Sequence, residues 1–233
     1  MDIVHYYMEK GEGEPLILLH GNGEDSSYFA KQMDAFAKYF HVMALDTRGH
    51  GQTPRGEAPF TIRQFAEDLL AFMDHHGIAK AHLLGFSDGG NIALVFALAH
   101  PERVAKLILN GANLDASGVK RGVQIPIEIG YRVAKLFAWM SAKAKTNAEL
   151  LGLMVNDPNV STEELRRLQV PTLVIAGTKD MIKESHSRQI ASSIPHAKLV
   201  ILPGDHFVAA GNPDAFNQAV LSFLGTLSNN DEQ

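Results

Sequence analysis

The sequence contains no cysteine, and that absence excludes several kinds of site. Without thiols the chain forms no disulfide, holds no zinc–thiolate centre and has no cysteine nucleophile. A chain that lacks cysteine also suits a reducing compartment, so we expect the protein to be cytoplasmic.

The sequence also has fewer basic than acidic residues: it contains 21 Lys and Arg and 26 Asp and Glu, which gives a formal net charge of -5. Electrostatics therefore favour neither nucleic acid nor an anionic membrane surface as a partner. The longest apolar run, "IALVFALA" from Ile92 to Ala99, is far too short to span a bilayer, and "MDIVHYYMEK" does not have the pattern of an export signal. We expect no membrane insertion and no nucleic-acid partner, and the oligomeric state stays open.

The apolar residues of this 233-residue chain, 45% of the total, suffice for the core of one globular domain. They gather in runs of strand length at 16–19, 42–45, 82–86, 107–109, 172–176 and 199–202. Polar residues do not alternate within these runs, and continuous apolar runs are typical of parallel strands that helices cover on both faces. The sequence therefore predicts a mostly parallel central sheet.

Between the runs, apolar residues recur at helical spacing. One stripe consists of Phe29, Met33, Phe36 and Phe40, and another of Ile62, Phe65, Leu69 and Phe72. Thr61 and Gln64 form a capping-box pattern ahead of the second stripe, and the segment 91–100 is apolar almost throughout, as in a buried helix. Strands that alternate with helices indicate an α/β fold with helices on both faces of the sheet.

The alternation stops between Asn113 and Gln169, where no strand-like run occurs. Helical patterns fill this stretch, one of them opened by the capping box of Ser161 and Glu164. We expect a core formed by residues 1–112 and 170–233, and a small helical cap, inserted after the third helix–strand unit, formed by residues 113–169. The apolar faces of the cap, and part of a substrate-binding pocket, are expected to come from Tyr131, Phe137, Trp139, Met140 and Met154.

The segment "GFSDGG", residues 85–90, raises the question of function. Ser87 directly follows a predicted buried strand and precedes a predicted buried helix, with Gly85 and Gly89 two positions away on either side. This is the G-x-S-x-G pattern of a nucleophile elbow, whose sharp turn leaves room only for small residues at the flanking positions. The glycines do not fit a nucleotide site: no lysine follows Gly90, as a P-loop requires, and the third glycine of a dinucleotide fingerprint would fall on Ser26.

Five segments together resemble the α/β-hydrolase superfamily: "PLILLHG", "DTRGHGQT", "LLGFSDGG", "VPTLVIAGTKD" and "LPGDHF". The motif G-x-S-D-G-G is most similar to that of the biphenyl-hydrolase-like serine esterases. The family order of nucleophile, acid and histidine matches Ser87, Asp180 and His206, each of which follows a predicted strand. Since ligands bind outside the carboxyl ends of parallel strands, we expect these three side chains to converge there.

The resemblance implies a role for each of these residues. Ser87 is the nucleophile, His206 takes its proton, and Asp180 holds His206 in the required tautomer. The backbone N–H groups of Asn22 and Asp88 are implied as the oxyanion hole, which stabilises the negative charge that develops during attack on a carbonyl.

Three polar residues near these motifs are expected to be structural. The resemblance implies that His20 takes no part in proton transfer and that Arg48 holds the loop "DTRGHG" together, while Asp205 is expected to shape the turn before His206. Family members open with a strand hairpin before "PLILLHG", whereas only about 15 residues stand here. The sheet is therefore expected to lack the usual first strand.

A triad with an oxyanion hole implies acyl transfer through a covalent acyl-enzyme, without a metal or an organic cofactor. Our first interpretation is a hydrolase of small to medium carboxylic esters. Family relatives run thioester, amide and carbon–carbon bond hydrolysis and peracid formation with the same residues, and analogy of fold does not choose among them. A small-molecule receptor of this fold, with slow or single turnover, is the alternative from another class.

The aspartate that follows Ser87 has two interpretations. In the biphenyl-hydrolase-like esterases that cleave amino-acid esters, the matching aspartate is near the substrate's amino group, so Asp88 is also a candidate substrate-binding residue. Alternatively, Asp88 caps the following helix, whose first turn gains from a negative charge.

Overall fold

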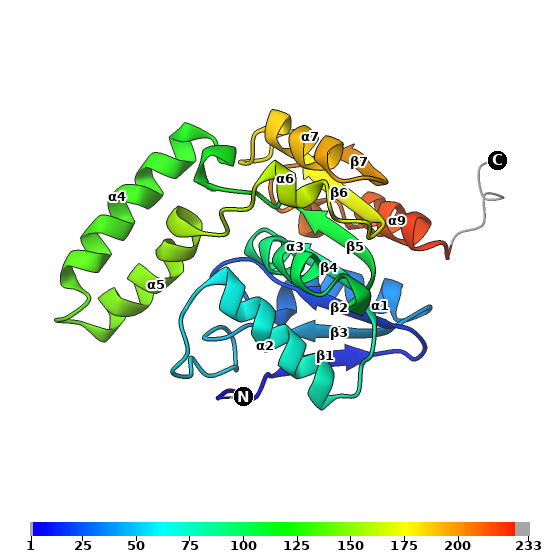
Figure 1. The fold of residues 1–233 in the computed structure, drawn as a ribbon, viewed down its shortest axis with the longest axis horizontal. Coiled ribbons are helices and arrows are strands. Elements are labelled where there is room, and N and C mark those ends of the chain that lie inside the picture. Colours follow the sequence, from blue (N-terminus) through cyan, green and yellow to red (C-terminus); the bar gives the residue numbers. More distant parts are fainter. Residues whose placement is uncertain (1, 227–233) are drawn as a thin grey trace.

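The computed structural model describes residues 2–226, and a seven-stranded sheet forms its centre (Figure 1). Its strands are β1 (Tyr7–Lys10), β2 (Pro15–Leu19), β3 (His41–Leu45), β4 (Ala81–Phe86), β5 (Val104–Asn110), β6 (Thr172–Gly177) and β7 (Ala197–Leu202). They lie in the order β1-β3-β2-β4-β5-β6-β7. β1 runs antiparallel to β3 and every other neighbouring pair is parallel, which confirms the predicted mostly parallel sheet.

Helices cover both faces of this sheet. In chain order, the helices of residues 2–226 are α1 (Ala30–Phe36), α2 (Ile62–His75), α3 (Asp88–Ala99), α4 (Arg121–Phe137), α5 (Ala142–Asn156), α6 (Thr162–Leu165), α7 (Glu184–Ser193), α8 (Val208–Gly211) and α9 (Pro213–Leu224). Successive residues of β2 belong to different apolar layers: Leu16 and Leu18 belong to the layer that includes residues of α1, α8 and α9, whereas Ile17 and Leu19 belong to the layer that includes residues of α2, α3 and α7. Both faces of the strands are therefore buried, as their continuous apolar runs predicted.

The sheet begins with a single short edge strand. Between residues 2 and 14 the chain forms only β1, so the sheet lacks the usual first strand, as expected. Among residues 2–226 we find no helix with both the length and the apolar composition needed to cross a membrane.

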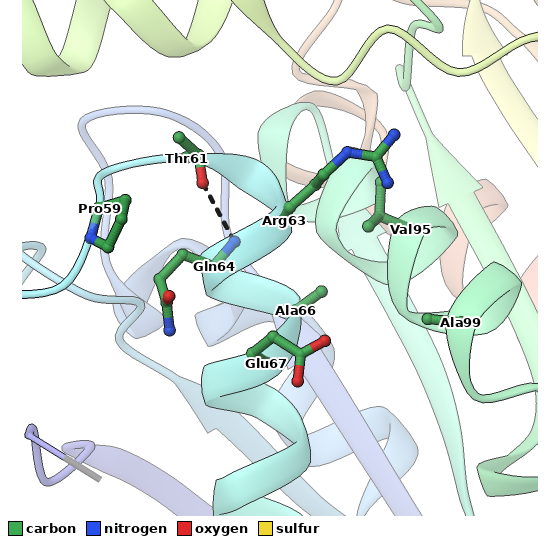
Figure 2. A pocket seen from close by; sticks show the side chains of 8 residues that line it. All are labelled: Pro59, Thr61, Arg63, Gln64, Ala66, Glu67, Val95 and Ala99. Atoms are coloured by element: carbon green, nitrogen blue, oxygen red, sulfur yellow. Dashed lines mark hydrogen bonds between the residues drawn. The ribbon is translucent and has the colours of Figure 1, made fainter.

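The predicted capping residues start two of the helices. The Thr61 hydroxyl accepts a hydrogen bond from the Gln64 N–H at 3.2 Å at the start of α2 (Figure 2). The Gln64 side chain donates to Asp68 rather than back to Thr61, so only half of that capping box forms. Both halves form at α6, where Ser161 and Glu164 satisfy each other's backbone N–H groups.

Helices α4 and α5 form a hairpin that stands beside the sheet rather than against either face of it (Figure 1). α6 behaves differently, because Leu165 and the following Leu168 are buried in the core layer that includes α2, α3 and α7. The segment between β5 and β6 is therefore helical, as expected. The division into a core and a cap at residues 113 and 169 stays a prediction.

The loop after β3 is anchored by Arg48, whose side chain is completely buried. Its guanidinium donates two hydrogen bonds of 2.7 Å to Asp68 of α2, two more to Asp2, and one to the Arg55 carbonyl. These contacts tie the loop to α2 and to the N-terminal segment, which confirms the predicted structural role. Because Asp68 and Asp2 are carboxylates, the pKa of Arg48 is raised above its usual value.

Replacing Arg48 with Met should lower the free energy of unfolding by about 3–5 kcal/mol, since the Asp68 carboxylate would stay buried without its partner. Urea denaturation followed by circular dichroism measures this change. The double variant Arg48→Met/Asp68→Leu should recover part of the loss, because it removes the unpaired charge. A loss below about 1 kcal/mol in the single variant, typical of a surface ion pair, would contradict the anchoring role.

Candidate active site

The predicted site residues meet at one edge of the sheet because of how the strands pair. The register sets Leu19 of β2 beside Gly85 of β4, and Gly177 of β6 beside Leu202 of β7. The turns that follow these four strands carry the predicted oxyanion loop, nucleophile, acid and histidine. The carboxyl ends of parallel strands thus assemble the site, as in other α/β sheets.

Ser87 occupies a sharp turn between β4 and α3. Its backbone has φ 53° and ψ -119°, a conformation rare for a residue with a side chain, and its N–H donates to the Asn110 carbonyl at 2.8 Å. A Cβ on Gly85 would lie 2.1 Å from the Gly89 carbonyl oxygen, and one on Gly89 would lie 2.0 Å from that of Leu19. The glycines flanking Ser87 are therefore required by backbone contacts.

Ser87, His206 and Asp180 form a continuous hydrogen-bonded chain. The Nδ1 atom of His206 lies 2.7 Å from Oδ1 of Asp180, and its Nε2 atom lies 3.0 Å from the Ser87 hydroxyl. Because a carboxylate accepts hydrogen bonds, Nδ1 carries the proton and Nε2 presents its lone pair to the hydroxyl. The serine is thus bonded to a group that can accept its proton.

The surroundings of Asp180 keep it charged. Burial alone would raise its pKa, but the bond from His206 and those from the N–H groups of Ile182 and Gly177 outweigh burial, so the pKa lies below the usual value. Asp205 instead accepts a hydrogen bond from the Phe207 N–H at 2.9 Å and shapes the turn, as predicted.

His20 is engaged away from Ser87. Its Nδ1 donates to the Gly21 carbonyl at 2.8 Å, and its Nε2 accepts from the Thr47 N–H at 3.0 Å. Burial lowers the pKa of His20 to about 4, so the ring is neutral at physiological pH. It joins the oxyanion loop to the loop after β3, which agrees with the predicted structural role.

The two predicted oxyanion donors flank the Ser87 turn. Asp88 is the first residue of α3, so its N–H has no carbonyl partner within the helix. Asn22 lies in the loop after β2, which is closed by two hydrogen bonds: the Gly21 N–H donates to the Glu24 carboxylate, and the Glu24 N–H donates to the Gly21 carbonyl. Burial raises the pKa of Glu24.

The side chain of Asn22 links three parts of the site. Its Nδ2 group donates to Oδ2 of Asp88 and to the Leu150 carbonyl of α5, both at 2.8 Å. The other oxygen of Asp88 accepts from Asn91 at 3.3 Å. Burial raises the pKa of Asp88 to about 6, and the nearby Asp157 charge adds to this effect. The carboxylate is thus held by two side-chain amides, a role that neither interpretation from the sequence included.

A cavity of about 280 Å³ opens onto Ser87 and His206. It is lined by Asn22, Glu24, Phe86, Ser87, Met154, Met181, His206 and Phe207. Met154 of α5 thus lines the cavity, and its role in substrate binding stays a prediction. Asp88 is almost completely buried and does not belong to this lining.

Three predicted substrate-binding residues lie elsewhere, and the prediction for them is corrected. Phe137, Trp139 and Met140 are 48%, 82% and 63% exposed and are absent from the cavity lining. The inner face of α4 is the one that carries Tyr131, whose ring lies over Gly152 of α5. Helical spacing identified apolar faces of α4 correctly, but it could not tell which face meets the site.

Four lining residues were not identified from the sequence: Glu24, Phe86, Met181 and Phe207. The last three are direct chain neighbours of the triad residues, and a neighbour shares the turn that presents the catalytic side chain. Adjacency alone would have found them. Glu24 offered no such signal, because its place depends on how the loop after β2 closes.

A second hollow, of about 290 Å³, lies between the start of α2 and α3 (Figure 2). It is lined by Pro59, Thr61, Arg63, Gln64, Ala66, Glu67, Val95 and Ala99, none of which belongs to the predicted site. Within residues 2–226, no group of three or more His, Asp or Glu side chains is placed to hold a metal ion.

Comparison with known proteins agrees with this architecture. A family model described as the alpha/beta hydrolase fold matches residues 14–144, more than half of the chain. A relative from Caulobacter sp. (strain K31), named as the carbamate hydrolase RutD, is 32% identical to this chain. The match covers 91% of this chain and 90% of the relative.

Solved structures extend the likeness to the whole fold. A variant of the meta-cleavage product hydrolase CumD from Pseudomonas fluorescens IP01 has a TM-score of 0.78 and 26% identity, covering 96% of this chain and 95% of its own. The enol-lactonase of Burkholderia xenovorans LB400 has a TM-score of 0.76 and 27% identity, covering 94% and 96%. From its seven-stranded sheet, the matching family model and these relatives, the chain belongs to the α/β-hydrolase family.

Proposed function

We propose that this α/β-hydrolase cleaves small to medium carboxylic esters through an acyl-enzyme formed on Ser87. The observation that carries the proposal is the chain of hydrogen bonds from Asp180 through His206 to the Ser87 hydroxyl, which opens onto a cavity of about 280 Å³. A serine hydroxyl is a weak nucleophile until a base takes its proton, and this arrangement provides that base.

In the proposed reaction, the Ser87 oxygen attacks the ester carbonyl carbon while Nε2 of His206 takes the hydroxyl proton. The carbon–oxygen bond to the alcohol then breaks, and His206 returns the proton to the departing alcohol. Water next attacks the acyl carbon and gives a proton to His206. The bond to the Ser87 oxygen then breaks, and the acyl group leaves as the carboxylic acid. Ser87 recovers the proton, and Asp180 stabilises the imidazolium in both halves of the reaction.

The developing oxyanion would be stabilised by the N–H groups of Asn22 and Asp88. The Asp88 N–H lies at the N-terminus of the 12-residue helix α3, where the helix dipole favours negative charge. The loop that carries Asn22 is held by Glu24 and by the Asn22 side chain itself, so the donors are positioned before substrate binds.

The character of the cavity supports short, uncharged acyl groups. Four of its lining side chains, Phe86, Met154, Met181 and Phe207, are apolar, and its volume lies at the small end of ligand pockets. The names of the relatives differ in reaction: one indicates carbamate hydrolysis and another the opening of a lactone, which is a cyclic ester. Both reactions cleave a bond to a carbonyl carbon, as ester hydrolysis does. Helices α4 and α5 would serve as the cap over this site.

A series of p-nitrophenyl esters from acetate to octanoate, with a matching carbamate, tests the reaction class. We expect multiple turnover with the highest kcat/KM on acetate to butyrate, because longer chains exceed the cavity. Ser87→Ala, His206→Ala and Asp180→Asn should each lower kcat by at least about 10³-fold, since triad members act as a unit. Release of p-nitrophenol measures turnover, and the Tm of each variant checks folding.

Asp205→Asn is the matched control, because Asp205 is next to His206 yet bonds only to the turn. Its activity should stay within a few-fold of the native protein. If Asp205→Asn lowered activity as much as Asp180→Asn does, without lowering stability, the wrong acid would have been assigned. A single slow turnover with a ligand-dependent rise in Tm would instead establish the receptor, and activity highest on emulsified long-chain triglyceride would rule out the small acyl pocket.

For Asp88, the hydrogen bonds support a positioning role. Both of its carboxylate oxygens accept from amides, and one of these amides belongs to Asn22, whose N–H is a proposed oxyanion donor. Recognition of a substrate amino group would need the carboxylate to reach the cavity, whose lining does not include it. We therefore propose that Asp88 holds the oxyanion loop against the start of α3.

Asp88→Asn should lower kcat about 5- to 10-fold on both valine benzyl ester and its des-amino analogue, because the amide offers one acceptor oxygen where the carboxylate offers two. KM should change little. Asp214→Asn removes an acidic residue from the first turn of α9 and controls for the helix dipole, and it should leave kcat unchanged.

The contrary result would be a native preference for the amine that Asp88→Asn abolishes. That preference would also weaken as the pH falls through about 6, where Asp88 takes up a proton and loses its charge. Such a pair of results would make Asp88 a residue that recognises substrate charge.

A further inference from the structure

One side of α4 is an exposed row of large apolar side chains that the proposed reaction does not use. We call it the α4 stripe, and it comprises Ile125, Ile129, Val133, Leu136 and Phe137, together with Trp139 and Met140 in the turn that follows. Intervals of three and four residues keep its members on one side of the helix. The cavity lies on the other side of the hairpin, at Met154 of α5.

The α4 stripe is large for a surface that stays in water. Ile129 is 56% exposed, Leu136 66% and Trp139 82%, and the other members are similarly exposed. Together these side chains present on the order of 800 Å², about what one partner buries in a standard-size protein interface. Contiguous apolar patches of this size on soluble proteins mark interaction sites.

The spacing of the α4 stripe is close to symmetric about a point between residues 132 and 133. Two α4 helices that pack antiparallel around a two-fold axis at this point would set Ile129 opposite Leu136 and Val133 beside its own copy, and would bring Ile125 near Met140 in the turn after the partner's α4. A two-fold contact requires a patch that is complementary to itself, and a symmetric row of similar apolar side chains meets that requirement.

The charge around the α4 stripe gives association with a second copy and association with an anionic surface opposite dependences on salt. Segment 121–150 carries five basic side chains, Arg121, Arg132, Lys135, Lys143 and Lys145, and two acidic ones, Glu128 and Glu149. Two such hairpins repel each other weakly, so their association would come from apolar contact and would strengthen with salt. Adsorption to anionic lipid would weaken with salt.

We infer that the α4 stripe is the contact surface for a second copy of this chain, in a two-fold dimer that pairs the α4 helices antiparallel. The two hairpins then form a four-helix layer between the cores, with both cavities left open on the far sides of α5. This assembly is independent of the proposed ester hydrolysis.

Sedimentation equilibrium of the full chain tests the dimer. We expect twice the chain mass at micromolar concentration and tighter association at higher salt. Val133→Glu places a charge at the two-fold axis and should give the monomer mass with an unchanged far-ultraviolet circular dichroism spectrum. Val4→Glu is the matched control, since Val4 is 77% exposed and lies outside the hairpin, and it should stay dimeric.

Cross-linking tests the pairing itself. Because the chain has no native cysteine, only the introduced thiols can form a disulfide. Val133→Cys should form a disulfide-linked dimer on oxidation. Ile125→Cys alone should not, because its two copies would lie on the order of 20 Å apart along antiparallel helices. A mixture of Ile125→Cys and Met140→Cys proteins should cross-link.

A monomer at every concentration would overturn the inference, as would a dimer that Val133→Glu leaves intact or a cross-link of Ile125→Cys to itself. Monomers that bind vesicles of anionic lipid, more weakly as salt rises, would overturn it in favour of a membrane surface.

Discussion

The close approach of two backbones at the Ser87 turn is the constraint on which the site depends. The first turn of α3 lies so close to the end of β2 that no side chain fits at Gly89. The N-terminus of α3 therefore comes next to the loop that carries Asn22. The same contact fixes the strained backbone of Ser87, which points its hydroxyl toward His206. The proposed nucleophile and the proposed oxyanion donors are therefore positioned by one packing contact.

The hairpin of α4 and α5 is joined to this centre through a polar contact. The Asn22 amide bonds to both the Asp88 carboxylate and the Leu150 carbonyl, so α5, the oxyanion loop and the start of α3 share one side chain. Met154 of α5 contributes to the cavity, whereas the outer side of α4 takes no part in it. The two helices thus have different tasks: α5 meets the site, and α4 presents a surface to the surroundings.

The sequence predicts the core of this molecule well because burial leaves a local record. The runs at 16–19 and 172–176 are apolar throughout, as strands covered on both faces must be, and the glycines around Ser87 record a contact that tolerates no side chain. Contacts between distant segments leave no such record. The bond from Asn22 to Leu150 spans 128 positions, and the orientation of Phe137, Trp139 and Met140 depends on which face of α4 packs against α5.

The claim that Ser87 is the activated nucleophile is tested most directly by a fluorophosphonate ester, which forms a stable bond to an activated serine. The account predicts one adduct per chain, located on Ser87 by peptide mass spectrometry, with activity falling in proportion to labelling. His206→Ala should slow labelling strongly, because the base that takes the Ser87 proton is lost. Labelling of another residue, or full hydrolytic activity after Ser87 is labelled, would contradict it.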